Sequence, residues 1–478
     1  MSKPNIVLVM SDEMRYDCMG RTSNGFVRTP ALDALAREGV FFENAFVSTP
    51  LCIPARVSLF TGRYSHATGV SDNRPEPMAD PLDTMVDIFS RAGYATSLCG
   101  KNHLFTDVEL PRRFDHVVEY GHFGRISAGG LLAEKDVTAF MWQVFARYWV
   151  DEAPFPIEVT PNCRITDEAI GFLNRRDPAR PFFLWLSYVD PHGPIMTPKP
   201  YAGMYDPAAM PPWPTVPDEY ARKPFRQRLA REGDLLKRIG GKDGMNHLRA
   251  AYTGMVTYVS DQVGRFVDEL ARRELRDNTI VVFTSDHGDH QGNHGLTHKS
   301  VTLYDDLIRV PLIINSPGRI APRAVSDTMV DQIDLMPTLL DLAGLETPDT
   351  TDGRSLAPLL RGETRHHRDA VFGEYGFEGD ALRPDELTPE LRDEIFKHYT
   401  PEFHPAVCRG RFRSIRTRDW KYVHYSSGER ELYDLKNDPL ELTNLAGDPH
   451  VAATENDLRA RLLEWSIAAT DPLGSSAM

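Results

Sequence analysis

Short apolar runs alternate with segments of helical periodicity over the first two-thirds of the chain. The runs cover residues 5–10, 94–99, 182–189, 278–284 and 311–315. Runs of this length, bounded by glycine, proline or polar residues, predict buried strands. Strands that alternate with helices are typical of an α/β fold, so we expect a large mixed, mainly parallel sheet flanked by helices.

Two helices between these runs have recognisable boundary signals. Residues 31–38 follow Thr29 and Pro30 and precede Gly39, which predicts a side-chain cap, a first-turn proline and a C-terminal glycine. Residues 84–92 predict a second helix, which is also followed by a glycine.

Ionisable residues stand just past the carboxyl ends of several predicted strands. They are Asp12, Lys101, His103, His192, Asp286 and His287. In open α/β sheets, ligands bind at this edge. We therefore expect these side chains to converge on one site.

The pattern changes at about residue 366. The stretches RSIRTRDWKYVHY and ERELYDLKNDPLELTNLA predict antiparallel strands with turns, and residues 458–468 predict a final amphipathic helix. We expect a catalytic α/β domain over residues 1–365 and a smaller α+β unit with an antiparallel sheet over residues 366–478.

Two other stretches, residues 119–160 and 195–247, have no clear period. Long excursions of this kind are either functional lids or disordered segments, and the sequence leaves both readings open.

The composition narrows the function classes. The chain has 478 residues, 41% apolar and 26% charged, without a run of roughly 20 apolar residues that could span a bilayer. The first apolar run is followed at once by acids, which does not fit a secretory signal. A net charge of −14 disfavours nucleic acid, and five scattered cysteines favour a reducing compartment. We expect a cytoplasmic protein with a small substrate and no nucleic-acid or membrane partner.

One cysteine has an unusual setting, in LCIPARVSLFTGR at residues 51–63. Cys52 precedes Pro54 where a helix begins, and helix N-termini favour negative charge. A thiol there is expected to have a lowered pKa and could act as a nucleophile. The alternative for an isolated cysteine is a packed, inert side chain.

The surrounding motif resembles the signature of the type I, formylglycine-dependent sulfatases of the alkaline phosphatase superfamily. The matching residues are Cys52, Pro54, Arg56, Ser58, Leu59, Thr61, Gly62 and Arg63. Further motifs follow in the family's order over nearly the whole chain: NIVLVMSDE, GKNH, DPHGP, SDHGDHQGNHGLTHK, LYDDLIRVPLII, RDWKYV and ELYDLKNDPLELTNL. The resemblance implies an alkaline-phosphatase-like sheet.

The resemblance also implies a mechanism. A formylglycine-generating enzyme would convert Cys52 to an aldehyde that hydrates to a geminal diol. One hydroxyl would attack sulfur, and the other would then expel sulfate by elimination, which avoids a stable sulfate ester on the enzyme. The implied ligands of one divalent cation are Asp12, Asp286, His287 and modified Cys52, with Glu13 where most members have a second aspartate. Ca²⁺ is implied, and Mg²⁺ or Mn²⁺ stays open because calcium does not prefer imidazole.

The remaining roles are likewise implied by resemblance. Arg56 would hold the diol, Lys101 and Lys299 would clamp the sulfate oxygens, and His103 would take the diol's second proton. His192 would protonate the leaving alcohol, and Asn73 would line the pocket. The alternatives are a solvated surface charge for each lysine and a turn residue for each histidine. His290, His294 and His298 are given no catalytic role, and His294 is expected to brace its loop.

We therefore predict a sulfuric ester hydrolase that acts on a small organosulfate. The alternative is a phosphonate monoester or phosphodiester hydrolase, in which the lysine and histidine of GKNH are replaced. A non-catalytic scaffold is disfavoured because nucleophile, metal ligands and lysines are all present. Specificity should come from the two excursions and from C-terminal loops such as residues 372–380. A homo-oligomer is compatible with the sequence.

Overall fold

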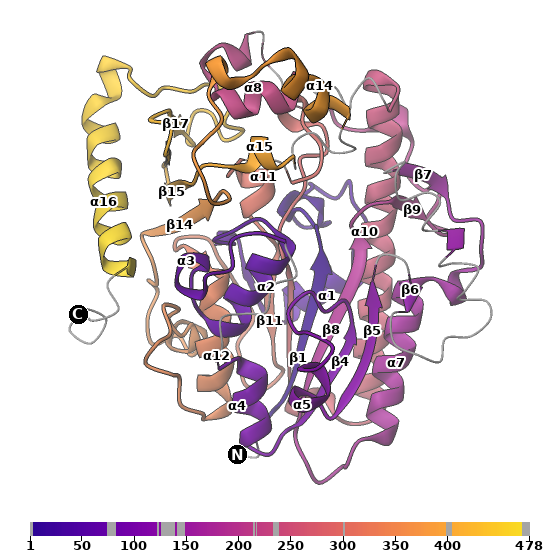
Figure 1. The fold of residues 1–478 in the computed structure, drawn as a ribbon. Helices are drawn as coiled ribbons and strands as arrows, with labels where there is room; N and C mark the ends of the chain where they lie inside the picture. The colour runs from indigo at the N-terminus through magenta and orange to yellow at the C-terminus, as the bar shows by residue number, and fades with distance from the viewer. Residues whose placement is uncertain are drawn as a thin grey trace.

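A nine-stranded mixed sheet forms the centre of the computed structural model (Figure 1). The structure describes residues 3–73, 83–121, 124–125, 139–140, 149–213, 216, 218–232, 239–299, 302–397 and 404–470. The strand order is β12-β2-β11-β10-β1-β8-β4-β5-β6. The strands are β1 (Asn5–Asp12), β2 (Val40–Phe42), β4 (Ala95–Gly100), β5 (His116–Gly121), β6 (Gly124–Arg125), β8 (Phe182–Pro191), β10 (Thr279–Ser285), β11 (Leu312–Asn315) and β12 (Arg323–Val325).

Most of the pairings are parallel, as predicted. β1 pairs in parallel with β8 and β10, and β4 pairs in parallel with β5 and β8. The antiparallel pairings are those of β11 with its two neighbours and of β5 with β6.

Helices cover both faces of the sheet, and alternate residues of β1 face two cores. Val7 and Val9 pack in the core shared with α1 (Pro30–Glu38), α7 (Pro161–Arg175) and α10 (Gly241–Arg272). Ile6, Leu8 and Met10 pack on the opposite face, with α2 (Cys52–Thr61), α4 (Met85–Arg91) and α12 (Leu335–Ala343). The central strands are therefore buried on both sides, which explains their nearly continuous apolar sequence.

The predicted helix ends are partly confirmed. α1 begins with Pro30, but Thr29 makes no side-chain cap; its hydroxyl accepts a hydrogen bond from Gly20 instead. Gly39 is extended rather than left-handed, and a Cβ there would lie 2.7 Å from the Ile314 carbonyl oxygen. Close approach of β11 therefore requires this glycine.

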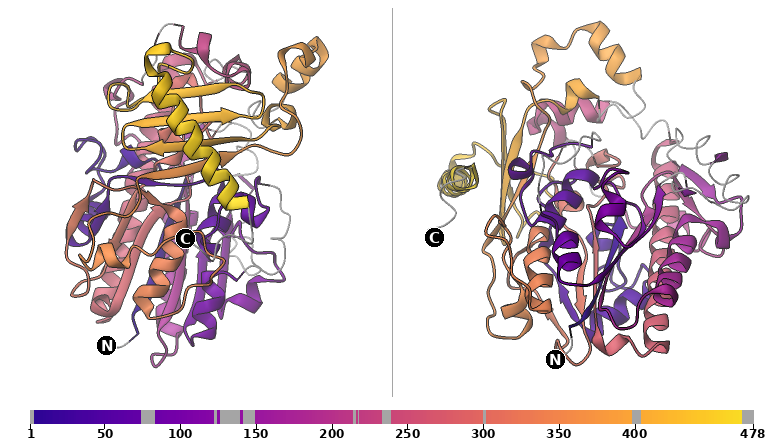
Figure 2. Two further views of the ribbon diagram at one scale, coloured as in Figure 1. Left: turned by 90° about the vertical axis from the view of Figure 1, so that its left-hand side faces the viewer. Right: turned by 60° about the horizontal axis from the view of Figure 1, so that its bottom comes forward.

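The C-terminal unit contains the predicted antiparallel sheet and final helix. Its strands are β14 (Ala370–Tyr375), β15 (Phe412–Thr417), β16 (Trp420–Tyr425) and β17 (Arg430–Asp434), paired in that order. α16 (Ala452–Thr470) crosses one face of this sheet (Figure 2). Leu458 and Leu462 of the helix pack there against Ile415 and Tyr422.

Shorter elements connect these layers. They are β3 (Ala45–Phe46), α3 (Ser65–Thr68), α5 (Leu110–Arg113), β7 (Trp149–Glu152), β9 (Ile195–Thr197), α8 (Phe225–Glu232), α11 (Asp305–Ile308), β13 (Val330–Asp331), α13 (Ala357–Leu360), α14 (Pro389–Lys397) and α15 (Pro405–Cys408). The excursion over 195–247 therefore contains β9, α8 and the start of α10, and much of 119–160 lies outside the described residues. In the described part of the chain, every helix is too short or too polar to cross a membrane.

Candidate active site

Four adjacent strands, in the order β10-β1-β8-β4, bring the predicted site residues to one edge of the sheet. Asp286 follows β10, Asp12 ends β1, His192 follows β8, and Lys101 follows β4. Since these strands run parallel, their carboxyl ends meet at the same edge. The strand order thus explains why residues far apart in the sequence share one site.

Cys52 belongs to a buried group of metal-ligand side chains. One donor atom each from Cys52, Asp12, Asp286 and His287 lies within 4.8 Å of the others. The Cys52 sulfur lies 3.2 Å from His287 Nε2 and 3.7 Å from Asp12 Oδ1. His287 Nδ1 donates to the Gly288 carbonyl oxygen over 2.8 Å, so its Nε2 is directed at the group. This arrangement is a candidate centre for a divalent cation.

Arg56 is fully buried and braces the two aspartates. Its Nε donates to Asp286 over 3.0 Å, and a terminal nitrogen lies 3.3 Å from Asp12. The other terminal nitrogen donates to the Lys101 carbonyl oxygen and the Ser187 hydroxyl over 3.0 and 2.9 Å. The guanidinium therefore fixes the carboxylates and the backbone that carries Lys101.

Two buried lysines point at the Cys52 sulfur. Lys299 Nζ lies 3.2 Å and Lys101 Nζ 3.8 Å from Sγ. Lys101 also pairs with Asp12, and Lys299 lies 3.5 Å from Glu13. Both side chains are buried, so the reading of each lysine as a solvated surface charge is wrong. Residue 52 therefore lies between the two ammonium groups and the other side chains of the candidate cation centre.

The predicted lowering of the Cys52 pKa is wrong for the unmodified side chain. Burial raises the pKa of this thiol, and the Asp12 carboxylate raises it further, against the opposing effect of Lys101 and Lys299. Desolvation and the neighbouring acid outweigh both lysines.

Glu13 is grouped differently from the other predicted ligands. Its carboxylate forms a second group with Asp289 and His298, again with donor atoms within 4.8 Å of one another. Burial raises the pKa of Glu13 to about 8, against the attraction of Lys299. Sequence reasoning gave Asp289 and His298 no metal role, although the density of Asp and His in SDHGDHQGNHGLTHK was a visible signal.

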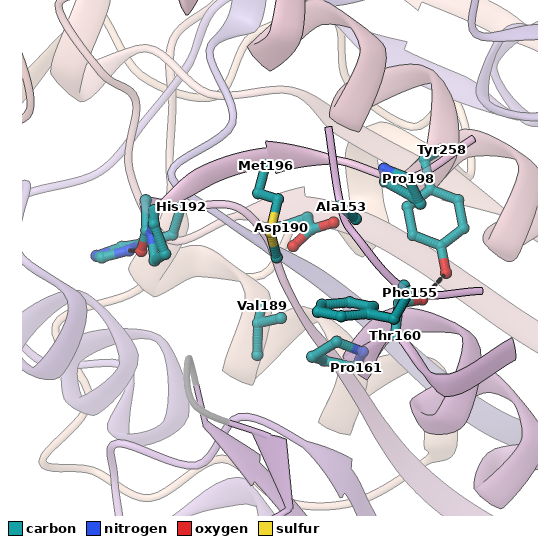
Figure 3. A pocket seen from close by; sticks show the side chains of 12 residues that line it. Ala153, Phe155, Thr160, Pro161, Val189, Asp190, His192, Met196, Pro198 and Tyr258 are labelled. Carbon is teal, nitrogen blue, oxygen red and sulfur yellow. Dashed lines mark hydrogen bonds between the residues drawn. The ribbon is translucent and has the colours of Figure 1, made fainter. Parts of the chain in front are cut away.

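His192 lies at the edge of a small pocket (Figure 3). Its Nδ1 donates to the Gly193 carbonyl oxygen over 2.7 Å, and its Nε2 lies 3.4 Å from Glu13 Oε2. Phe155 and Met196 are among the residues that line a cavity of about 20 Å³ there. A cavity of this size holds about one water molecule. This pocket is therefore too small for the organic part of a substrate.

Asn73 and His103 lie close to the site without a demonstrated role. The Asn73 side-chain oxygen accepts a hydrogen bond from the Ile53 amide over 3.0 Å, in the first turn of α2. His103 is exposed, two residues after Lys101, with a φ of 51°. Their predicted functions in substrate binding and proton transfer stay predictions.

Residues 286–299, which follow β10, are called the metal loop here because they contain the candidate ligands Asp286 and His287. Two other histidines of this loop have local partners. His290 Nδ1 pairs with Asp306 over 2.9 Å. His294 Nδ1 bonds Glu219 over 2.6 Å, and its ring stacks on Tyr304 with centroids 3.9 Å apart. His294 thus braces the loop, as predicted.

Comparison with known proteins agrees with this geometry. The family model described as Sulfatase matches residues 4–345, and that described as N-sulphoglucosamine sulphohydrolase, C-terminal, matches residues 376–468. An arylsulfatase from Clostridium perfringens is 33% identical over 493 residues, which cover 97% of this chain and 94% of the relative. An N-acetylglucosamine-6-O-sulfatase from Bacteroides thetaiotaomicron is 27% identical, over 97% of this chain and 86% of the relative.

A solved structure shows the same fold. The phosphonate monoester hydrolase of Agrobacterium radiobacter superposes with a TM-score of 0.78 at 27% identity, over 98% of this chain and 96% of that chain. The extent of the family-model match and the identity to the arylsulfatase show that the chain belongs to the sulfatase family of the alkaline phosphatase superfamily and is a hydrolase of that family.

Proposed function

We propose that this enzyme hydrolyses a small organosulfate monoester to an alcohol and sulfate. The observation that carries the proposal is the position of residue 52, between the candidate cation centre and the ammonium groups of Lys101 and Lys299. A sulfate group held there meets positive charge from two lysines. Such charge stabilises the oxygen charge that develops during ester cleavage.

One divalent cation would be held by Asp12, Asp286, His287 and residue 52. Two carboxylates and one imidazole, all buried and within reach of a shared point, fit such an ion. When bound, the ion lowers the pKa of the attacking hydroxyl and neutralises sulfate oxygens. We expect Ca²⁺, and the imidazole makes Mg²⁺ and Mn²⁺ the alternatives that elemental analysis must separate.

Glu13 is proposed as a further ligand. Its side chain is fully buried, and its carboxylate oxygens lie 3.5 Å from Lys299 and 3.4 Å from His192 without a hydrogen-bond partner in the described part of the chain. A buried carboxylate without hydrogen bonds is costly, and a cation would offset that cost. We expect Glu13→Gln to weaken metal binding about tenfold or more, measured by competition with a chelator. Unchanged affinity would assign Glu13 to positioning His192 instead.

We propose that residue 52 acts as formylglycine, installed by a formylglycine-generating enzyme. As a hydrated aldehyde it supplies a nucleophilic hydroxyl and a second hydroxyl whose deprotonation releases sulfate. Five cysteines without disulfides in the structure support a reducing, cytoplasmic location.

The surrounding side chains have separate proposed roles in this reaction. Lys101 and Lys299 would orient the sulfate, while Arg56 fixes the metal-binding carboxylates and supports the charge at residue 52. His192, with Nε2 directed at the site, would donate a proton to the leaving alcohol. His103 is proposed to accept the proton released during expulsion of sulfate.

The second candidate is a phosphonate monoester hydrolase. It is supported by the likeness to the enzyme of Agrobacterium radiobacter. The buried Lys101 and the following His103 favour sulfate, because the resemblance implies that both are replaced in the phosphonate enzymes.

The test compares an aryl sulfate with an aryl phosphonate monoester on the metal-loaded enzyme. We expect a higher kcat/KM for the sulfate, loss of turnover in Cys52→Ala, and a peptide mass that shows aldehyde at residue 52. A large preference for the phosphonate would select the second candidate. Full turnover by Cys52→Ala would contradict both.

A further inference from the structure

A second cavity lies between residues 49–72, the segment that contains Cys52, and the C-terminal sheet. Its volume is about 440 Å³, more than twenty times that of the pocket behind His192. One wall comes from the segment around α3, including Thr49, His66 and Asp72. The facing wall comes from the end of β14, the loop after it and the start of β15. None of the proposed catalytic steps uses this cavity.

The cavity begins close to the nucleophile. Thr49 stands three residues before Cys52, and three residues of chain span at most about 11 Å. On the other side, Asp72 precedes Asn73, whose side-chain oxygen lies 3.0 Å from the Ile53 amide nitrogen. The cavity wall therefore includes Thr49, close to Cys52 in the sequence, and Asp72, next to a residue that contacts the first turn of α2.

Two arginines at the start of β15 line the cavity. Arg411 immediately precedes the strand and Arg413 is its second residue, and both line the cavity. The Arg413 guanidinium lies 5.3 Å from the centre of the Trp465 ring, and that ring stacks on Phe372. Arg413 is thus held in place by α16 through a cation–π contact.

Three acidic side chains, Asp72, Glu374 and Glu378, also line the cavity, and two of them form long ion pairs with these arginines. Glu374 lies 3.8 Å from Arg413, beyond hydrogen-bond distance. Its two carboxylate oxygens instead accept from the His66 amide and pair with His66 Nδ1, over 2.9 and 2.8 Å. Glu378 pairs with Arg411 over 3.5 Å, with both side chains exposed, so this pair is weak and a ligand can displace it.

We infer that this cavity receives the organic part of the substrate, and that Arg411 and Arg413 bind a second anionic group on it. Guanidinium groups bind carboxylate and sulfate through paired, charge-assisted hydrogen bonds. The substrate class is an organosulfate that also has a carboxylate or a second sulfate. This inference rests on the proposed function, because it assigns the specificity of the same active site.

The experiment measures sulfate release from two sets of sugar sulfates by the metal-loaded enzyme. One set contains hexose monosulfates, and the other contains hexose disulfates and sulfated uronic acids. We expect the best dianionic substrate to exceed the best monosulfate about tenfold or more in kcat/KM. In Arg413→Ala this ratio should fall about tenfold or more, and Arg413→Lys should restore part of it.

Arg418→Ala is the matched control. Arg418 is an exposed arginine just beyond the other end of β15, outside the cavity, so its removal should leave the ratio unchanged. Arg411→Ala tests the same cavity if Arg413→Ala fails to fold, because the Arg411 side chain is 62% exposed. The inference is overturned if the wild type prefers monosulfates, or if the ratio is the same in both cavity variants and the control.

Failure of the proposed function would look different. If the enzyme releases no sulfate from any substrate, including an aryl sulfate, then calorimetric titration of Cys52→Ala with a hexose disulfate still tests the cavity. We expect binding that is about tenfold weaker after Arg413→Ala is added. Equal binding by Cys52→Ala with and without Arg413→Ala would refute the anion site independently of turnover.

Discussion

At the residue scale, the site depends on a balance of buried charge. Arg56, with a fully buried side chain, is shared between Asp12 and Asp286, the same carboxylates that would hold a cation. Breaking a buried ion pair by removing one partner costs about 3–5 kcal/mol, because the remaining charge stays buried. A cation bound between the two aspartates would offset part of that cost.

We therefore expect Arg56→Met to lower the melting temperature strongly in chelator and much less with saturating divalent metal. Thermal denaturation in the two conditions measures the difference. Arg112→Met, which removes an exposed arginine of α5, is the control and should shift neither curve. An equal loss for Arg56→Met with and without metal would show that the arginine and the ion act on different groups.

The sequence predicted much of this site but not its internal contacts. Lys101 and Lys299 were identified from their motifs, and only the structure shows that both ammonium groups reach the Cys52 sulfur. The grouping of Glu13 with Asp289 could not be predicted, because it depends on a left-handed backbone at Glu13 and on the path of the metal loop. The pKa of Cys52 was mispredicted because a helix end is visible in a sequence and desolvation is not.

At the element scale, the position of Lys101 depends on close contact between β4 and β8. Gly100, the last residue of β4, has a φ of 118°, and a Cβ there would lie 1.8 Å from the Ser187 carbonyl oxygen. That oxygen also accepts a hydrogen bond from the Lys101 amide over 2.9 Å. Separation of the two strands would therefore displace Lys101 from Asp12 and from residue 52.

We expect Gly100→Ala to reduce both stability and kcat/KM, the latter by about a hundredfold, since a displacement of about 1 Å can cost that much. Gly93→Ala is the matched control: its φ is 87°, but a Cβ there meets no atom within 4 Å. It should cost about 1 kcal/mol of backbone strain and leave the activity unchanged. Equal kinetics for the two variants would show that the strand contact does not position Lys101.

Element identities were predictable where the pattern is local. Residues 5–10 and 182–189 are apolar runs between polar boundaries, and both became central strands. The order of the strands was not predictable, because pairing joins segments far apart in the chain. The antiparallel β11 between β10 and β2 shows this, since its sequence resembles that of the parallel strands around it.

At the scale of the whole molecule, the C-terminal sheet shares a hydrophobic core with the catalytic unit. Tyr375, Phe412 and Tyr425 of the sheet pack in one cluster with Leu51 and Leu303. Leu51 is the residue before Cys52, the proposed nucleophile. The sheet therefore supports the segment that presents residue 52.

Because of this shared core, we expect the full chain to unfold in a single transition, and residues 1–365 alone to be aggregation-prone and inactive. Differential scanning calorimetry of the full chain and circular dichroism of the truncated chain test this. Two separate transitions, or a truncated chain with native near-ultraviolet dichroism, would contradict it.

A buried ion pair gives the whole molecule a specific sensitivity to acid. Arg368, just before β14, pairs with Asp334 at the start of α12, which also accepts from His367 Nε2 over 2.9 Å. Burial alone would raise the pKa of Asp334, but Arg368 and His367 lower it below its ordinary value of 3.8. This carboxylate therefore contributes stability above pH 3.8, and the contribution is lost as the pH falls, because the unfolded chain binds the proton first.

We expect Asp334→Asn to lower the free energy of unfolding by about 3–5 kcal/mol at pH 7. The difference from the wild type should narrow as the pH is lowered below 3.8. Urea denaturation at pH 7, 5, 4 and 3 measures the trend. Asp369→Asn, an 83% exposed carboxylate near the same segment, is the control and should differ from the wild type at no pH. If the Asp334→Asn difference stayed constant across this range, the pair would act through packing rather than through charge.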